Sequence, residues 1–222
     1  TNVDYVFVHH TQKDEFIRLA QAYVAKHCPD INHKDYTSVI DERSYQRLLD
    51  TLEDARTKGA SITNLSGEQQ PNPELRKIPM HIVSDTTEDM TIRQRETFGP
   101  LLMLLTYTDP QEVIDYVNAH DRPLAFYPFS NNAQLTDRYI ERIMSGGVTV
   151  NDALFHVAQH DIPFGGVGPS GMGHYHGYEG FVTFSKLRPV FYQPGFSAMK
   201  FLRPPYGGFA DWVYNLLVKL KS

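Results

Sequence analysis

The hydrophobic pattern alternates between short apolar runs and stretches with apolar residues at helical spacing. Runs of strand length lie at residues 3–8, 60–63, 78–83, 101–107, 125–129 and 148–150. Between them, apolar residues recur every three or four positions, which predicts helices near residues 16–24 and at 42–58, 111–119 and 132–144. Strands that alternate with helices in this way are typical of an α/β fold.

Each predicted helix has an apolar face that we expect to be buried. In the first predicted helix this face consists of Phe16, Leu19, Ala20, Tyr23 and Val24, and in the second it consists of Tyr45, Leu48, Leu49, Leu52 and Ala55. In the helix at 132–144 it consists of Leu135, Tyr139, Ile140, Ile143 and Met144. The run Leu101–Tyr107 is continuously apolar, which predicts a strand buried on both faces, as in a parallel sheet.

The C-terminal part has a different pattern. A helix is predicted around residues 178–185 and a strand around Arg188–Tyr192, followed by a link broken by prolines and glycines. The last segment predicts an amphipathic helix whose apolar face consists of Phe209, Trp212, Val213, Leu216, Leu217 and Leu220. This helix is too short to span a bilayer, so we expect it to lie at a membrane interface or to dock on protein.

Composition narrows the class of protein. With 222 residues, 41% of them hydrophobic and 21% charged, the chain is typical of a globular protein. A net charge of −5 gives no basic field for nucleic acid. The single cysteine, Cys28, excludes an internal disulfide framework and indicates a reducing compartment, so we expect a cytoplasmic protein without a cleavable signal.

Between Val148 and Gly180 the periodic pattern stops. This stretch contains seven glycines, two prolines and four histidines, which indicates a loop in which the backbone approaches other groups closely. Residues 166–171 match the G-x-G-x-x-G pattern of dinucleotide-binding turns, but no apolar strand precedes them and no uninterrupted helix follows. We therefore interpret them as a structural loop.

The spacing of His156, His160, His174 and His176, without a cysteine in register, does not favour a metal site.

Two sets of motifs resemble a known family. The segments Pro163-Phe164-Gly165-Gly166 and Ser170-Gly171-Met172-Gly173 resemble the C-terminal signature of aldehyde dehydrogenases. Upstream, Glu96-Thr97-Phe98-Gly99-Pro100 matches the E-x-F-G-P motif of the same family. The glycine loop is most similar to the branch of coniferyl-aldehyde and fatty-aldehyde dehydrogenases, and the resemblance extends from about Asp4 to the end.

The resemblance implies a fold and a set of site residues. The fold is the C-terminal part of a three-layer, parallel-sheet catalytic domain with a Rossmann-like α/β pattern in residues 1–185. An oligomerisation strand follows in residues 186–200, and a tail with an amphipathic helix in residues 201–222. By resemblance, Glu96 hydrogen-bonds the nicotinamide ribose of NAD or NADP, and Phe98 packs beside the nicotinamide. The aldehyde pocket is lined by Asn151, His156 and Phe164, with core packing as the alternative for Phe164.

The resemblance also implies what this chain lacks. The nucleophilic cysteine of the family would directly precede Thr1, so we expect no catalytic residue in this chain. Cys28, at the end of a predicted helix, is interpreted as a partly buried thiol. The chain alone is therefore expected to be inactive.

For the complete protein, the resemblance implies an NAD(P)-dependent oxidoreductase. It would oxidise coniferyl or another aromatic or fatty aldehyde to its acid as a homodimer or higher oligomer. The tail would cover the substrate funnel or contact a membrane peripherally. The alternative is a non-catalytic dimerisation or scaffold module derived from the same fold.

Overall fold

The computed structural model describes residues 3–221. It divides into two units, Thr1–Thr183 and Phe184–Ser222, each of which is described by itself.

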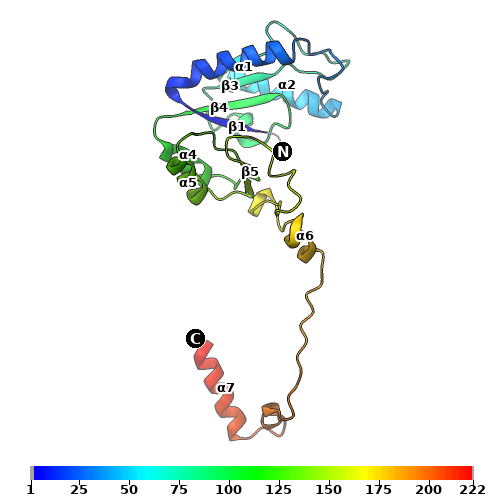
Figure 1. Ribbon diagram of the computed structural model, residues 1–222, viewed down its shortest axis with the longest axis vertical. Coiled ribbons are helices and arrows are strands. Elements are labelled where there is room, and N and C mark those ends of the chain that lie inside the picture. The colour runs from blue at the N-terminus through cyan, green and yellow to red at the C-terminus, as the bar shows by residue number, and fades with distance from the viewer. Residues whose placement is uncertain (1–2, 222) are drawn as a thin grey trace. The chain divides into compact units, whose positions relative to one another are not determined.

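A four-stranded sheet forms the centre of the first unit. Its order is β1 (Tyr5–His9), β4 (Leu101–Tyr107), β3 (His81–Ser84) and β2 (Ser61–Asn64). The strands β1 and β3 both pair in parallel with β4, so the apolar run predicted to be buried is one of the two inner strands of the sheet (Figure 1). The edge strand β2 is antiparallel to β3, because no helix in the segment between them returns the chain to the same end of the sheet.

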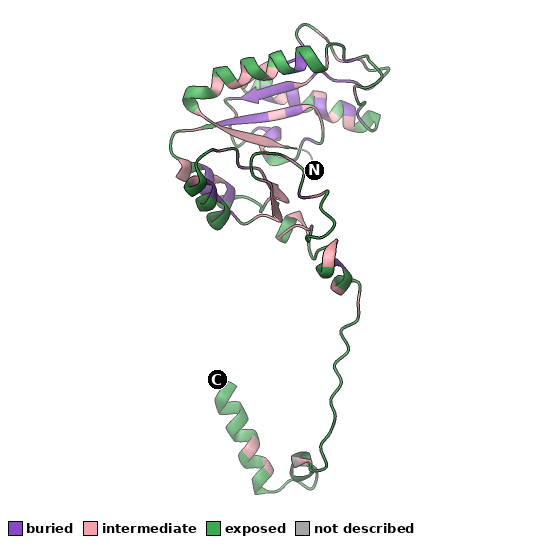
Figure 2. Cartoon of the chain, viewed as in Figure 1, coloured by how far each residue is buried: buried purple, intermediate pink, exposed green. Residues whose placement is uncertain are grey.

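Helices cover both faces of this sheet. One face packs against α1 (Lys13–His27), where Val24 joins Ile82 and Leu104 in a buried cluster. The other face packs against α2 (Glu42–Thr57), whose predicted apolar stripe meets β3 and β4 in the largest core cluster. The first unit therefore contains three layers, helix, sheet and helix, as expected for the α/β class, and Figure 2 shows buried residues in the strands of the sheet.

Local sequence explains where the main helices begin. The Asp41 carboxylate accepts a hydrogen bond of 2.7 Å from the Ser44 N–H at the start of α2. The helix α4 (Pro110–Ala119) begins with a capping box between Asp109 and Glu112 and has proline in its first position. Asn132 caps α5 (Ala133–Arg142) by accepting from the Leu135 N–H.

A second, two-stranded sheet consists of β5 (Ala125–Phe126) and β6 (Gly147–Val148), which are parallel. The helices α4 and α5 share a core cluster that consists of Val113, Ile114, Val117, Tyr139 and Ile143, and Phe126 packs against it. Both strands are shorter than the predicted runs, because only two residues in each form ladder hydrogen bonds. A short helix, α3 (Thr91–Gln94), was not predicted.

Two predicted helix faces are partly wrong. In α1, Leu19 and Tyr23 are 52% and 65% exposed, while Ile17, which the prediction omitted, packs against the core. Ile140 in α5 and Met144, which follows the end of that helix, are exposed as well. Each helix packs against its neighbours through a narrower strip than its apolar residues span, so the apolar residues at the border of that strip remain exposed to solvent.

The last part of the chain contains two further helices. Of these, α6 (Gly177–Thr183) belongs to the first unit, and α7 (Gly208–Lys221) ends the second, after a 3₁₀ turn at Ala198–Leu202. The predicted strand at Arg188–Tyr192 has no ladder partner within residues 3–221 and is extended chain there. A strand needs a hydrogen-bonded neighbour, so its role in oligomerisation stays a prediction. None of the described helices combines the length and the apolar character needed to cross a membrane.

Candidate functional site

The loop with the Glu96–Pro100 motif connects α3 to the N-terminal end of β4. Its second residue, Thr97, is 1% exposed, whereas Glu96 is exposed and Phe98 is 71% exposed. The loop is therefore anchored by Thr97, and it presents a carboxylate and an aromatic ring to the outside.

The peptide groups on both sides of Thr97 are each held by a charged side chain. Its N–H donates to Asp4 Oδ1 at 2.8 Å, and its carbonyl oxygen accepts from Arg47 Nη2 at 2.6 Å. The hydroxyl of Thr97 donates to the carbonyl oxygen of Leu101 at 3.2 Å. The next glycine is pressed against α2: a Cβ on Gly99 would lie 2.5 Å from a methyl carbon of a buried leucine. The loop has little room to move.

The backbone of Phe98 is in the left-handed region, with φ at 48°. For a bulky residue this conformation costs about 1–2 kcal/mol, so the surrounding contacts must hold it in place. An exposed ring in a strained, anchored position is suited to cover one face of a flat heterocycle. The neighbouring Glu96 carboxylate can accept hydrogen bonds from a pair of hydroxyl groups, such as those of a ribose.

The three predicted pocket residues lie in and next to the glycine loop. Phe164 and Tyr175 exchange two backbone hydrogen bonds, of 2.8 and 2.9 Å, which close the loop between them. The Phe164 ring is 8% exposed, and its centroid lies 5.6 Å from that of His156, which is 7% exposed. Both side chains are thus buried in the first unit, and for Phe164 this burial fits the alternative of core packing.

Asn151 has a bidentate contact with a neighbouring loop. Its Oδ1 accepts from the Ser130 N–H at 2.8 Å, and its Nδ2 donates to the Ser130 carbonyl oxygen at 3.1 Å. The contact joins the segments that follow β5 and β6. With φ at 56°, Asn151 also adopts a backbone conformation that asparagine tolerates better than most residues. Whether these three residues also contact an aldehyde stays a prediction.

The buried His156 ring is bound on one side only. Its Nδ1 lies 2.9 Å from Thr149 Oγ1, which also accepts from the His156 backbone N–H at 3.2 Å. Its Nε2 is buried and has no hydrogen-bond partner among residues 3–221. Burial lowers the pKa of His156 below the ordinary value of 6.5, because the charged ring would lose its hydration.

Replacing His156 with phenylalanine is expected to make the stability of the protein less sensitive to acid. Because the folded-state pKa of His156 is depressed, the unfolded chain takes up the proton first, and stability is lost as pH falls below about 6.5. Melting temperatures measured from about pH 8 to pH 5 should fall less in His156→Phe than in the wild type. The exposed His174→Phe is the matched control, and equal slopes in all three proteins would contradict the prediction.

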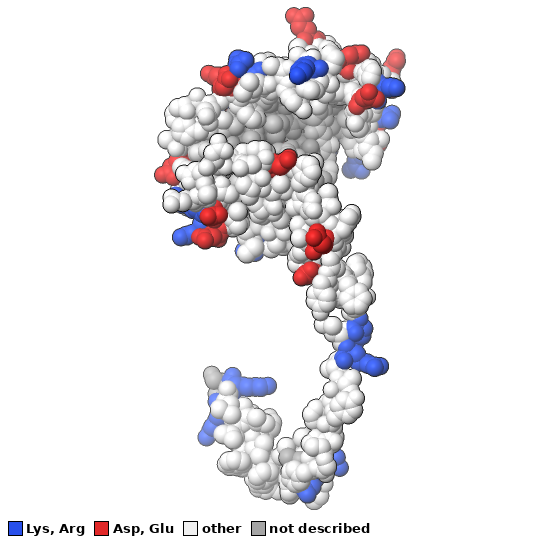
Figure 3. All heavy atoms as spheres, viewed as in Figure 1, with Lys and Arg blue, Asp and Glu red and all other residues white. Residues whose placement is uncertain are grey.

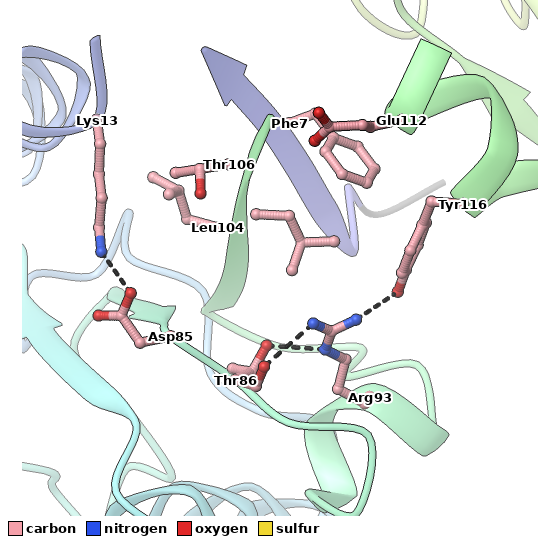
Figure 4. Close-up of a pocket in the computed structure, with 10 residues that line it drawn as sticks. Phe7, Lys13, Asp85, Thr86, Arg93, Leu104, Thr106, Glu112 and Tyr116 are labelled. Carbon is pink, nitrogen blue, oxygen red and sulfur yellow. Dashed lines mark hydrogen bonds and ion pairs between the residues drawn. The ribbon is translucent and has the colours of Figure 1, made fainter. Parts of the chain in front are cut away.

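A pocket of ≈280 Å³ lies elsewhere, near the C-terminal ends of β3 and β4 (Figure 4). Lys13 Nζ pairs with Asp85 Oδ1 at 2.7 Å, and Arg93 donates to Thr86 Oγ1 at 2.8 Å and to Tyr116 Oη at 3.3 Å. These polar groups satisfy one another, and none of the five predicted site residues lines the pocket. We therefore place the candidate site at the Glu96–Pro100 loop and not in this pocket.

Sequence reasoning missed Asp4 and Arg47. An aspartate before a strand and an arginine within an amphipathic helix are both common on protein surfaces, so neither pattern indicates a role. Their contacts with Thr97 span 93 and 50 positions of the chain. Only covariation among related sequences could have connected them in advance.

Comparison with known proteins gives a consistent result. The family model described as "Aldehyde dehydrogenase family" matches residues 1–190. A "Probable coniferyl aldehyde dehydrogenase" of Caulobacter vibrioides is 48% identical over 209 residues, which cover 92% of this chain and 43% of that protein.

Solved structures are similar as well. The substrate-bound state of Staphylococcus aureus AldH aligns with a TM-score of 0.75 and 31% identity, over 98% of this chain and 47% of that one. A 3,6-anhydro-L-galactose dehydrogenase in complex with NAP aligns with a TM-score of 0.68 and 26% identity, over 80% of this chain and 38% of that one. The chain thus spans less than half the length of the relatives it matches.

Proposed function

The chain belongs to the aldehyde dehydrogenase family, and on this premise we propose that the complete protein oxidises an aldehyde to its carboxylic acid. Water supplies the second oxygen of the acid, and NAD or NADP accepts the hydride. The observation that carries the proposal is the anchored loop that leaves both Glu96 and Phe98 exposed.

The residues present fit a nicotinamide cofactor. In this proposal Glu96 accepts hydrogen bonds from the ribose hydroxyls, and the open face of Phe98 packs beside the nicotinamide ring. The bound cofactor supplies a ring carbon that takes up the hydride. The chain's own contribution is to orient that ring, because hydride transfer is sensitive to small errors in position.

The proposed substrate is an aromatic aldehyde of the coniferyl type, and fatty aldehydes are the alternative. Support comes from the name of the Caulobacter vibrioides relative and from its identity over nearly the whole of this chain. The pocket residues are proposed to be Asn151, His156 and Phe164. The nucleophilic thiol is proposed to precede residue 1, because Cys28 packs on the α1 face of the sheet.

The proposal is tested by assaying the complete protein with coniferyl aldehyde, benzaldehyde and long-chain aldehydes, each with NAD and with NADP. Aldehyde-dependent formation of reduced cofactor, with one equivalent of acid per equivalent of reduced cofactor, is the expected result. Residues 1–222 expressed alone serve as the comparison, and we expect no activity from them. The proposal fails if the complete protein reduces neither cofactor with any of these aldehydes.

The second unit is proposed to make contacts with a partner. Of the seven charged residues between 184 and 222, six are Lys or Arg, and Figure 3 shows such side chains along this unit. In α7, Phe209, Trp212 and Leu217 are more than half exposed. A basic, aromatic surface of this kind fits either a second subunit or an anionic membrane surface.

Deleting residues 209–222 from the complete protein is expected to change chain-length preference and aldehyde affinity more than turnover of a small aldehyde, because a tail acts on access and not on the reacting atoms. Steady-state kinetics with short and long aldehydes measure this difference. Unchanged kinetics combined with lost binding to anionic vesicles would assign the tail to the membrane instead.

A further inference from the structure

The contact between Asp4 and Thr97 connects the start of β1 to the Glu96–Pro100 loop. Asp4 lies directly before β1, and its own carbonyl oxygen accepts from the Met103 N–H at 3.3 Å, so its backbone already belongs to the sheet. Its half-buried carboxylate reaches the Thr97 N–H in the cofactor loop at 2.8 Å. The position of the loop is thereby set relative to the chain that enters β1.

The geometry of this contact favours a role in orientation. An ionised acceptor makes a stronger hydrogen bond to a peptide N–H than a neutral one, and Arg47 adds a second charge-assisted bond at the other side of the same residue. Rotation of the backbone at Thr97 would change the orientation of its neighbours Glu96 and Phe98. Two charged anchors on one residue remove that rotation.

The fold does not depend on this contact alone. Without the Asp4 carboxylate, Thr97 would keep its bond from Arg47, its hydroxyl bond to Leu101 and its buried side chain. The Thr97 N–H lies beside a half-buried aspartate, so water can reach it in a shortened variant. Loss of the carboxylate should therefore loosen the loop without unfolding the sheet.

We propose that Asp4 is a positioning residue for hydride transfer, which acts by fixing the Thr97 peptide and thereby the orientation of Glu96 and Phe98. The inference rests on the proposed function, since it assigns a task to a residue outside the predicted cofactor site. Asp4 does not touch the cofactor or the aldehyde in this scheme. Its effect should therefore appear in the rate of hydride transfer and in cofactor affinity, and not in aldehyde affinity.

The test compares Asp4→Ala with Asp4→Asn in the complete protein. Alanine removes the acceptor, and asparagine keeps an oxygen at the same position. We expect Asp4→Ala to slow single-turnover formation of reduced cofactor at least about tenfold and to weaken cofactor binding, with the aldehyde KM unchanged. Asp4→Asn should recover most of the rate. The exposed Asp137→Ala is the matched control and should match the wild type.

Further readouts separate this inference from the proposed function. Cofactor dissociation constants, measured by fluorescence titration without aldehyde, test Asp4 even if the complete protein oxidises no aldehyde, in which case only the proposed function fails. An Asp4→Ala protein with wild-type rate and wild-type cofactor affinity would overturn the inference and leave the function standing. If Asp4→Ala does not fold, Asp4→Ser, which keeps polarity but does not reach Thr97, takes its place. An equal loss of rate in the alanine and asparagine variants would also overturn it.

Discussion

Replacing Phe98 with alanine in the complete protein is expected to slow hydride transfer about a hundredfold, the effect of displacing a reacting group by roughly 1 Å. The ring is 71% exposed and held in a strained backbone conformation by the buried Thr97 beside it. Alanine keeps that backbone but, in the proposed binding mode, removes the ring that packs against one side of the nicotinamide. Single-turnover formation of reduced cofactor measures the loss directly.

Glu96→Gln should slow the same step, because an amide binds two ribose hydroxyls less strongly than a carboxylate does. Neither side chain is buried, so the melting temperatures of both variants should equal that of the wild type. Tyr23→Ala, which removes a 65% exposed ring from α1, is the matched control. Wild-type hydride transfer in both site variants would remove the basis of the cofactor assignment.

The parts of the fold that the sequence predicted best are those in which the spacing of apolar residues clearly indicates a strand or a helix. The strand β4 has the bounds of its predicted run, and its first five residues are buried or half-buried on both faces, although Thr106 near its end is exposed. The helix α2 buries the stripe that its spacing predicts, apart from the half-buried Leu49. The ends of β5 and β6 depend on hydrogen-bond pairing with one another, which periodicity does not encode.

The exposed residues of α1 and α5 show a second limit of sequence patterns. An apolar residue at the border of a helical stripe packs only if a neighbouring element reaches it, and that depends on tertiary geometry. Leu19 is 52% exposed, although the spacing places it next to the buried stripe. The direction of β2 is a similar case, because it follows from how the chain returns and not from the strand's own composition.

The candidate site was found through its motif and explained only by the structure. The E-x-F-G-P motif identified Glu96 and Phe98. Their exposure depends on Thr97, which is held by Asp4 and Arg47 from distant parts of the chain. Burial of the His156 ring likewise depends on Gly147, where a Cβ would lie 2.5 Å from a ring carbon. Contacts of this kind arise only when the whole unit has folded.

The second large effect is expected in the glycine loop, where Gly165→Ala should lower the free energy of unfolding by about 3 kcal/mol, at the upper end of the usual range for overpacking. A Cβ at this position would lie 2.1 Å from the carbonyl oxygen of Gly173. The carbonyl oxygen of Gly165 would in turn lie 2.1 Å from a Cβ on Gly146, which leads into β6. The obstacles are backbone atoms, which cannot rotate away as a side chain can.

Two other glycines of this chain distinguish the effect of steric crowding from the effect of a positive φ. Gly168 has φ at +62° with nothing within 4 Å of its added Cβ, so Gly168→Ala should cost only the conformational strain of about 1–2 kcal/mol. Gly195 has neither constraint, and Gly195→Ala should be close to neutral. Urea unfolding of the complete protein, compared at equal m-values, ranks the three variants. Close packing of the backbone at Gly165 predicts the order Gly165, Gly168, Gly195 from largest to smallest loss, and a Gly165→Ala protein as stable as Gly195→Ala would show that the loop relaxes instead of packing as described.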